Sequence, residues 1–178
     1  IAGIATAIAP GDTSVGTDTF TGVNQVRGSS FNDILTGGNA LYNSLESFDG
    51  RGGIDVIDGG QGWDRAEYSF NGAVTTGITV NLAAGTVTGD PVLVGTDTLH
   101  GIEAIRGSHL ADLYDATGFS GSSTNAGWNE TLNEFEGMAG NDTIIGNGST
   151  RLSFSSAREA VSVDLQAGTA VGGASVGT

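Results

Sequence analysis

The 178-residue chain contains no cysteine and no lysine, and its six basic residues are all arginines. Without cysteine it can form no disulfide, no thiolate nucleophile and no Cys-ligated zinc site, and cysteine usage leaves the redox compartment undetermined. Without lysine there is no Schiff-base chemistry and no phosphate loop of the GK[ST] type. Twenty acidic residues outweigh the arginines and give a net charge of −14 at pH 7. The chain therefore lacks the basic surface on which nucleic-acid binding depends, and we expect no nucleic-acid partner.

Long hydrophobic runs are also missing. No apolar stretch approaches the roughly 20 residues that a membrane-spanning helix needs, so we expect no membrane span. Residues 1–10 are mostly apolar but contain no methionine and no basic residue. We interpret them as the interior of a mature chain rather than as a signal peptide.

Glycine, in contrast, is unusually abundant, with 31 residues. Together with aspartate and asparagine it makes up nearly a third of the chain, while 38% of the residues are apolar. That apolar fraction is sufficient for a core, so the composition does not indicate disorder. An acidic chain that is rich in glycine, aspartate and asparagine and can still bury a core favours the binding of cations.

The chain repeats itself with a period of about 80 residues. Residues 15–23 (VGTDTFTGV) recur at 94–102 (VGTDTLHGI), and residues 80–86 (VNLAAGT) recur at 163–169 (VDLQAGT). A repeat of this length is a structural unit that stacks on its neighbours. We predict one unit at 1–84, a second at 85–167 and the start of a third at 168–178, which we interpret as part of a longer array.

A shorter period of nine residues lies within each unit. Residues 50–58 (GRGGIDVID) are followed directly by residues 59–67 (GGQGWDRAE), so that Asp55 and Asp64 are nine residues apart. Segments 28–36 and 137–145 have the same form, and 107–115 has it more loosely. These segments resemble the nonapeptide repeats of hemolysin-type (RTX) calcium-binding proteins, whose pattern is G-G-x-G-x-D-x-apolar-x. The segments between them are similar to the linking repeats of very long bacterial RTX proteins.

The pattern suits calcium, a hard cation that takes six to eight oxygen ligands at about 2.3–2.6 Å. Glycines allow a tight turn with inward carbonyls, and the apolar residue near the end of each nonapeptide can enter a core. The resemblance implies an all-β fold, a parallel β-roll or β-helix solenoid with short, interrupted calcium-binding turns. It also implies that each aspartate binds Ca²⁺ with the carbonyls five and three residues before it. The predicted ligand sets are Asp33 with Gly28 and Ser30, Asp55 with Gly50 and Gly52, Asp64 with Gly59 and Gln61, Asp112 with Gly107 and His109, and Asp142 with Gly137 and Ala139.

The chain departs from the family pattern in two ways. Segments 37–48 and 116–135 interrupt the nonapeptides, and we expect them to prevent a long regular roll. In the turn at 146–154, Arg151 stands where Asp64 stands in the first unit, so we expect one site fewer there. We hypothesise that the Arg151 guanidinium takes the place of the ion. Asp18 and Asp97 lie outside the nonapeptides, and we assign them to turn formation rather than to calcium.

Short strands are expected at 80–82, 98–99, 102–105 and 161–163, where apolar residues are bounded by glycine or aspartate. Helical signals are poor, and we expect at most one helical turn at 130–136. A G-x-S-x-G motif at 173–177 matches a nucleophile elbow. The serine is replaced by leucine at position 93 of the second copy, so we do not assign it a catalytic role. Calcium-dependent polysaccharide lyases and epimerases are the enzymatic rivals, but two degenerate repeats leave little room for an active cleft, and we predict no enzyme.

The resemblance implies a calcium-binding structural module of a secreted bacterial RTX protein, exported by a type I system and folding on calcium outside the cell. Its partners would be calcium ions and the neighbouring repeats of the same chain, at an extracellular or cell-surface location. One alternative is an adhesin or biofilm-matrix module whose loops contact extracellular glycans or other cells, for which Tyr42 and Trp128 are candidate residues. Another is an accessory module of a secreted polysaccharide-active enzyme.

Overall fold

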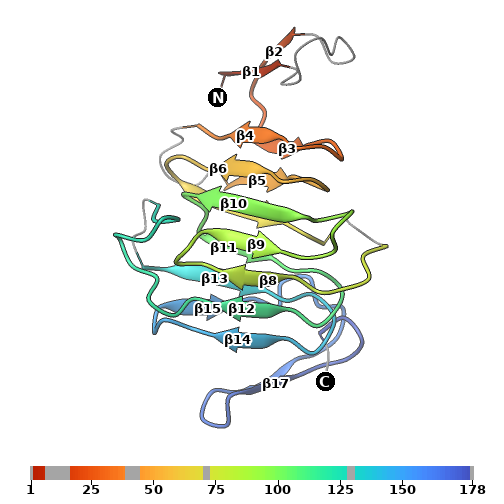
Figure 1. Ribbon diagram of the computed structural model, residues 1–178. Helices are drawn as coiled ribbons and strands as arrows, with labels where there is room; N and C mark the ends of the chain where they lie inside the picture. Colours follow the sequence, from red (N-terminus) through yellow and green to blue (C-terminus); the bar gives the residue numbers. More distant parts are fainter. Residues whose placement is uncertain (1, 7–16, 39–44, 70–72, 128–130, 177–178) are drawn as a thin grey trace.

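Two stacked sheets form most of the molecule (Figure 1). The computed structural model describes residues 2–6, 17–38, 45–69, 73–127 and 131–176, and these residues form no helix. The described part of the chain therefore contains no helix that could cross a membrane. In spatial order, the seven-strand sheet contains β14 (Thr143–Ile145), β12 (Leu113–Asp115), β8 (Thr79–Asn81), β9 (Thr86–Thr88), β10 (Thr96–His100), β6 (Val56–Asp58) and β4 (Ile34–Thr36). The six-strand sheet contains β15 (Thr150–Leu152), β13 (Asn133–Glu136), β11 (Ala104–Arg106), β7 (Trp63–Glu67), β5 (Leu45–Asp49) and β3 (Gln25–Arg27).

The chain passes back and forth between the two sheets, so that each pair of strands is one coil of a solenoid. All pairs in the six-strand sheet are parallel. The seven-strand sheet is parallel except for β9, which pairs antiparallel with β8 on one side and β10 on the other. Antiparallel hairpins lie at the two ends, β1 (Ala2–Thr6) with β2 (Thr17–Thr21), and β16 (Ser162–Asp164) with β17 (Thr169–Val171). The prediction of an all-β parallel β-roll is confirmed.

The expectation that segments 37–48 and 116–135 prevent a long roll is wrong. Strands on either side of each segment remain in parallel register, with Thr36 opposite Asp58 and Glu134 opposite Ala104. In the described part of these segments, residues 37–38, 116–127 and 131–132 lie outside the strands. Residues outside the strands do not alter the pairing of the strands that they join. The helical turn expected at 130–136 is also wrong, because Asn133–Glu136 forms β13 between β11 and β15.

The core lies between the sheets and follows the period of two that a strand imposes. Phe48, Ala66, Ile105 and Phe135 form one inward column of the six-strand sheet. Each is at most 3% exposed. The seven-strand sheet contributes a facing set that is at most 1% exposed: Ile57, Leu99, Val87, Val80 and Tyr114. In this core the Tyr114 ring stacks on Phe135 with the ring centroids 4.8 Å apart. The apolar residue of each nonapeptide therefore fixes the direction of the acid two residues before it.

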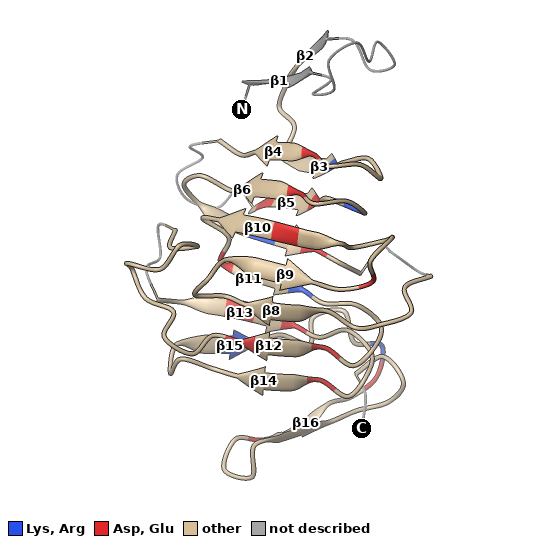
Figure 2. Ribbon diagram, viewed as in Figure 1, with Lys and Arg blue, Asp and Glu red and all other residues tan. Residues whose placement is uncertain are grey.

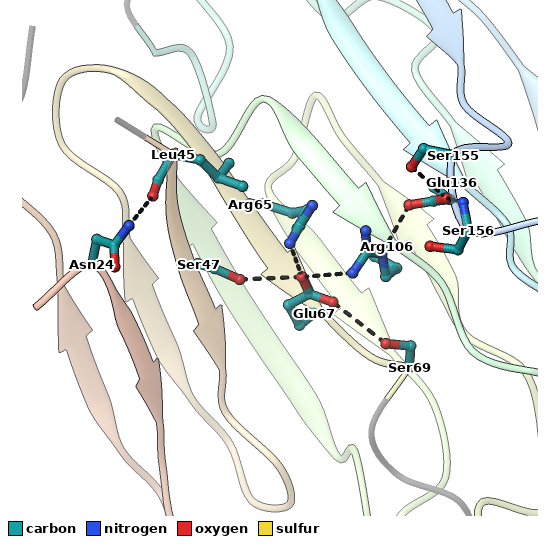
Figure 3. A network of polar contacts seen from close by, with 10 residues as sticks. All are labelled: Asn24, Leu45, Ser47, Arg65, Glu67, Ser69, Arg106, Glu136, Ser155 and Ser156. Carbon is teal, nitrogen blue, oxygen red and sulfur yellow. Dashed lines mark hydrogen bonds and ion pairs between the residues drawn. The ribbon is translucent and has the colours of Figure 1, made fainter. Parts of the chain in front are cut away.

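Four of the arginines form ion pairs on the outer face of the six-strand sheet, and Figure 3 shows the centre of this network. Arg106 lies between Glu67 and Glu136, with its Nε 2.8 Å from Glu136 Oε2 and its Nη1 3.4 Å from Glu67 Oε1. Arg65 also pairs with Glu67. These contacts join β7, β11 and β13 side by side. They also hold four of the six arginines on this face, away from the turns at the edges of the roll.

Candidate metal centre

Turns at two edges of the roll carry most of the acidic residues of interest. We call the turns that lead from the six-strand to the seven-strand sheet the first edge, and those that lead back the second edge. Strand register places Asp33, Asp55 and Asp97 in one row. Asp33 and Asp55 lie at the first edge, directly before β4 and β6, whereas Asp97 is the second residue of β10. Asp112 and Asp142, directly before β12 and β14, lie opposite each other in a separate pair further along the axis. Figure 2 shows these acidic segments repeating where β4, β6, β12 and β14 begin.

Backbone hydrogen bonds connect the first-edge carboxylates along the stack. The Asp33 N–H donates to Asp55 Oδ1 at 2.9 Å, and the Asp55 N–H donates to Asp97 Oδ1 at 3.1 Å. In the second half of the roll the Asp112 N–H donates to Asp142 Oδ1 at 2.9 Å. Each of these bonds uses one carboxylate oxygen, and the other oxygen of Asp55 and of Asp142 faces its own turn.

The second oxygen meets the first glycine of its turn. A Cβ at Gly50 would lie 2.2 Å from Asp55 Oδ2, and a Cβ at Gly137 would lie 1.9 Å from Asp142 Oδ2. A Cβ at Gly28 would lie 2.4 Å from Asp33 Oδ2 and 3.0 Å from the carbonyl oxygen of Gly50 in the next turn. Only glycine leaves space for the carboxylate at these positions. The structure thus brings three predicted aspartates together with the glycines five residues before them.

Gly107 and Asp112 have the same arrangement, with 2.2 Å between the would-be Cβ and Asp112 Oδ2. The Asp112 carboxylate also accepts hydrogen bonds from the backbone and the hydroxyl of Ser108 at 2.8 and 2.7 Å. The residues predicted to supply the second carbonyl of each set are Ser30, Gly52, Gln61, His109 and Ala139. Ser30, Gln61 and His109 are exposed, whereas Gly52 is buried beneath the Val92 carbonyl. Their role as ligands stays a prediction.

Burial raises the pKa of several first-edge carboxyls in the metal-free chain. Asp55 is fully buried and its Oδ2 has no hydrogen-bond partner among the described residues. Its pKa is raised to about 6, chiefly by desolvation. Desolvation also raises the pKa of Asp97 and of Asp142 to about 7 each. A buried carboxylate that lacks a partner is costly, so this row favours a bound cation.

At the second edge, Glu46, Asp64 and Glu103 occupy equivalent register positions on β5, β7 and before β11. They are 3%, 0% and 1% exposed. The Asp64 N–H donates to Glu103 Oε2 at 3.0 Å, but neither carboxylate oxygen of Asp64 has a hydrogen-bond partner in the described part of the chain. Burial first, and then the charges of Glu103 and Glu46, raise the pKa of Asp64 to about 7.

Backbone carbonyls lie beside these second-edge acids. A Cβ at Gly59 would lie 2.4 Å from the carbonyl oxygen of Gly101 and 2.6 Å from Asp64 Cβ. A Cβ at Gly37 would lie 2.2 Å from the carbonyl oxygen of Gly59 and 2.7 Å from Glu46 Oε2. Carboxylate and carbonyl oxygens from adjacent turns are therefore close to one another on both sides of Asp64.

Sequence reasoning missed Glu46 and Glu103, and it assigned Asp97 to turn formation. The structure places Asp97 in the same row as Asp33 and Asp55, fully buried, with its Oδ2 accepting a hydrogen bond from the Tyr68 hydroxyl at 3.0 Å. The signal that identifies all three acids is the residue two positions later, which is apolar and buried: Phe48, Leu99 and Ile105. The aspartate and the apolar residue of a nonapeptide have this same spacing.

The hypothesis that Arg151 takes the place of an ion is wrong. The turn before β15 is one residue shorter than the turn before β7, so Thr150 rather than Arg151 has the register of Asp64. Arg151 instead points outward, where it pairs with Glu134 and lies 5.2 Å from the ring of Trp63. Asn133 and Thr150, both uncharged, follow Glu103 in the second-edge row. The absence of a calcium site at the turn before β15 stays a prediction. Its reason is now that the second-edge row is uncharged at Asn133 and Thr150.

The described residues fit a hard cation held largely by carbonyls. They contain no group of three or more His, Cys, Asp and Glu side chains placed to hold a metal ion, so protein carbonyls would have to supply many of the ligands. Calcium accepts such a mixture of backbone and carboxylate oxygens, whereas zinc prefers nitrogen and sulfur. The unpartnered oxygens of Asp55 and Asp64 are positioned where such an ion would satisfy them.

A family model of the RTX calcium-binding nonapeptide repeat matches the chain in four copies, within residues 16–40, 46–67 and 132–150. The chain contains RTX repeats. The matched ranges include Asp33, Asp55, Asp64 and Asp142, whereas Asp112 lies outside them. RTX repeats are calcium-binding motifs, so the predictions of the family and of Ca²⁺ are confirmed. No curated protein and no solved structure matches the chain.

The RTX ranges leave out residues 41–45 of the first interrupting segment and residues 116–131 of the second. Tyr42 and Trp128, the aromatic residues that would favour glycan binding by these loops, lie outside the residues that the structure describes. The adhesin alternative and the accessory role beside a polysaccharide-active enzyme therefore stay predictions.

Proposed function

We propose that this RTX chain is a structural module whose roll is completed by calcium ions at both edges and which folds when it meets calcium outside the cell. Asp33, Asp55 and Asp97, and separately Asp112 and Asp142, would hold ions at the first edge. Glu46, Asp64 and Glu103 would hold them at the second edge. The observation that carries this proposal is Asp64, fully buried with both carboxylate oxygens unpartnered and two more buried carboxylates beside it.

Charge explains why folding would depend on the ion. When metal-free, the edge rows bring buried carboxylates close together in a glycine-rich chain that loses much conformational entropy on ordering. A bound Ca²⁺ supplies the positive charge and the ligand field that these oxygens lack. At an ion concentration of 100 times the dissociation constant, each independent site would stabilise the fold by about 2.7 kcal/mol. Several such sites are enough to convert a marginal fold into a stable one.

The proposed location follows from the family. RTX repeat proteins are typically secreted by bacteria, and export in an unfolded state requires that folding wait until the chain is outside. A fold that depends on extracellular calcium provides that delay. For this chain, secretion, type I export and folding outside the cell are inferences from the family and from the acidic edge rows.

A calcium titration of metal-free protein tests the proposal. We expect far-UV circular dichroism to gain β signal cooperatively, and tryptophan emission to change together with it, because Trp63 adjoins Asp64. A chelator should reverse both changes, and magnesium should not replace calcium, since Mg²⁺ requires a smaller and more regular site. A chain that has its full β signal without metal and does not respond to calcium would overturn the proposal.

Glu103→Gln tests the second-edge assignment separately. The substitution preserves the size of the side chain and an acceptor for the Asp64 N–H but removes a charge, so we expect weaker binding of calcium and fewer ions per chain by isothermal titration. Asp164→Asn is the matched control. It also removes one charge, but its exposed side chain serves only the turn after β16, where it accepts from the N–H groups of Gln166 and Ala167. Equal effects of the two variants would exclude Glu103 as a ligand.

A further inference from the structure

The second-edge turn before Glu103 is three residues shorter than the turn before Asp64. Strand register places His100 opposite Asp58, so two residues separate His100 from Glu103, whereas five separate Asp58 from Asp64. A turn of two residues brings fewer backbone groups to the second edge than a turn of five. Part of this coil is therefore left to be filled by another segment of the chain.

Residues 124–127 of the second interrupting segment fill that place. The Asn125 side chain is fully buried, with its Oδ1 accepting from the Ile102 N–H at 3.0 Å and its Nδ2 donating to the Ile102 carbonyl oxygen at 2.7 Å. One amide side chain thus pairs with both backbone groups of a residue in the short turn, as a neighbouring strand would. The Thr124 N–H donates to the carbonyl oxygen of Ala83 at 3.1 Å, which joins the segment to the turn between β8 and β9 as well.

Gly127 brings the same segment against Glu103. A Cβ at Gly127 would lie 1.8 Å from Glu103 Oε1 and 3.2 Å from the Cα of Gly101, so only glycine permits this approach. Glu103 is 1% exposed, and Asp64 beside it is fully buried. The segment therefore contributes to the burial of Glu103 and separates this part of the second-edge row from water.

The sequence around Asn125 recurs in the first interrupting segment. Residues 125–129 are NAGWN and residues 39–43 are NALYN, with leucine in place of the central glycine. The structure does not describe residues 39–43. The recurrence indicates that residues 125–129 belong to the repeating unit and are not an unrelated insertion.

We propose that residues 124–127 cover the second-edge calcium site and that Asn125 is the positioning residue that holds this cover closed. The inference rests on the proposed function, because it concerns the calcium site assigned there to Asp64 and Glu103. Release of the ion then requires that the cover first leave Ile102. Each hydrogen bond of Asn125 contributes a modest net free energy, so the loss of both should speed release about tenfold and should not abolish binding.

Stopped-flow mixing of the calcium-loaded chain with a chelator tests this inference. The parent chain and all variants carry Trp128→Phe, which leaves Trp63, next to Asp64, as the single tryptophan and the reporter of release. We expect Asn125→Ala, which removes both bonds to Ile102, to release calcium about tenfold faster than the parent. The number of bound ions by isothermal titration should stay the same, because Asn125 positions the cover and is not a ligand.

Three further variants in the same segment sharpen the comparison. Gly127→Ala places a Cβ against Glu103 Oε1, displaces the cover without touching Asn125, and should also speed release about tenfold. Gly118→Ala is its matched control, because a Cβ there meets nothing within 4 Å. Ser122→Ala, on an exposed side chain, is the control for Asn125→Ala. Both controls should release calcium at the rate of the parent.

The outcomes separate this inference from the proposed function. If the parent binds calcium and every variant releases it at the same rate, the cover is excluded and the calcium module stands. If the two controls release calcium as fast as Asn125→Ala, the rate reflects general loosening of the segment, and the inference fails. A parent chain that binds no calcium overturns both. Circular dichroism in calcium shows which variants fold, and Gly127→Ala decides the matter if Asn125→Ala does not.

Discussion

Asp64 combines two opposing contributions to stability in a single residue. Its carboxylate is fully buried and has no hydrogen-bond partner among the described residues, which destabilises the metal-free fold, but the same oxygens would bind a cation. Asp64→Asn removes the charge and preserves the shape. We expect the free energy of unfolding to rise by roughly 1–3 kcal/mol in the metal-free protein and to fall by a similar amount in saturating calcium. Urea unfolding under both conditions measures this reversal of sign. A change of the same sign in both would show that Asp64 has only a structural role.

The nonapeptides that contain Asp55 and Asp64 could be recognised from their nine-residue spacing and their resemblance to RTX repeats, and the family match includes both. Their role as ligands stays a prediction. The acidic residues that lie outside a recognisable glycine pattern, Glu46 and Glu103, could not be predicted. Glu46 and Glu103 reach the second edge because Phe48 and Ile105 are buried, and burial is a property of the whole stack. Arg151 illustrates the opposite error. A turn that is one residue shorter moves a side chain to the other face of its strand, and a sequence alignment does not reveal that shift.

At the scale of the element, two glycine substitutions distinguish an effect on calcium binding from an effect on backbone conformation. Gly50→Ala would place a Cβ 2.2 Å from Asp55 Oδ2, so the carboxylate must move, and we expect calcium affinity to fall by about tenfold. Gly148 has a φ of 90° and nothing within 4 Å of its would-be Cβ. Gly148→Ala should therefore cost about 1 kcal/mol of stability through the backbone while leaving calcium affinity unchanged. Calcium titrations and urea unfolding of both variants give the comparison, and equal calcium affinities would argue against the Gly50 turn as a site.

Strands were predicted where apolar residues are bounded by glycine or aspartate, as at 80–82 and 98–99, which overlap β8 and β10. The helical turn expected at 130–136 is wrong, because Asn133–Glu136 is a strand. In the structure, Asn133 and Phe135 point inward and Glu134 and Glu136 pair with arginines on the outer face. This is the period of two of a strand, and it becomes visible only when β11 and β15 are present on either side.

At the scale of the whole molecule, the two 80-residue units share their sheets. β10 of the second unit pairs with β6 of the first, and β8 of the first unit pairs with β12 of the second. The interruptions in sequence suggested separate short rolls, but parallel stacking requires only that strands return to register. The unit boundaries at residues 84 and 167 stay a prediction about the sequence repeat. Cooperative unfolding should extend across both units, because nearest-neighbour contacts cross the boundary.

The edge rows also predict how stability depends on pH in the whole molecule. Burial raises the pKa of Asp55 to about 6 and the pKa of Asp64, Asp97 and Asp142 to about 7, from an ordinary value of 3.8. Groups whose pKa is raised on folding stabilise the fold fully below their unfolded pKa, and they lose that contribution as pH rises through the folded value. We therefore expect the free energy of unfolding of metal-free protein to fall between about pH 4 and pH 7 and to level off above it.

In saturating calcium the slope should reverse over the same interval. Protons compete with the cation for the edge oxygens, so lowering the pH weakens calcium binding and removes the stability that it contributes. Urea unfolding across this pH range gives the free energy of unfolding as a function of pH, once without metal and once in saturating calcium. The protein is freed of metal beforehand, because chelators lose affinity in acid. Curves that cross would identify the edge carboxylates as the common site of protons and calcium. A metal-free protein that becomes more stable as pH rises would show that these carboxylates are stabilised by the protein itself and need no ion.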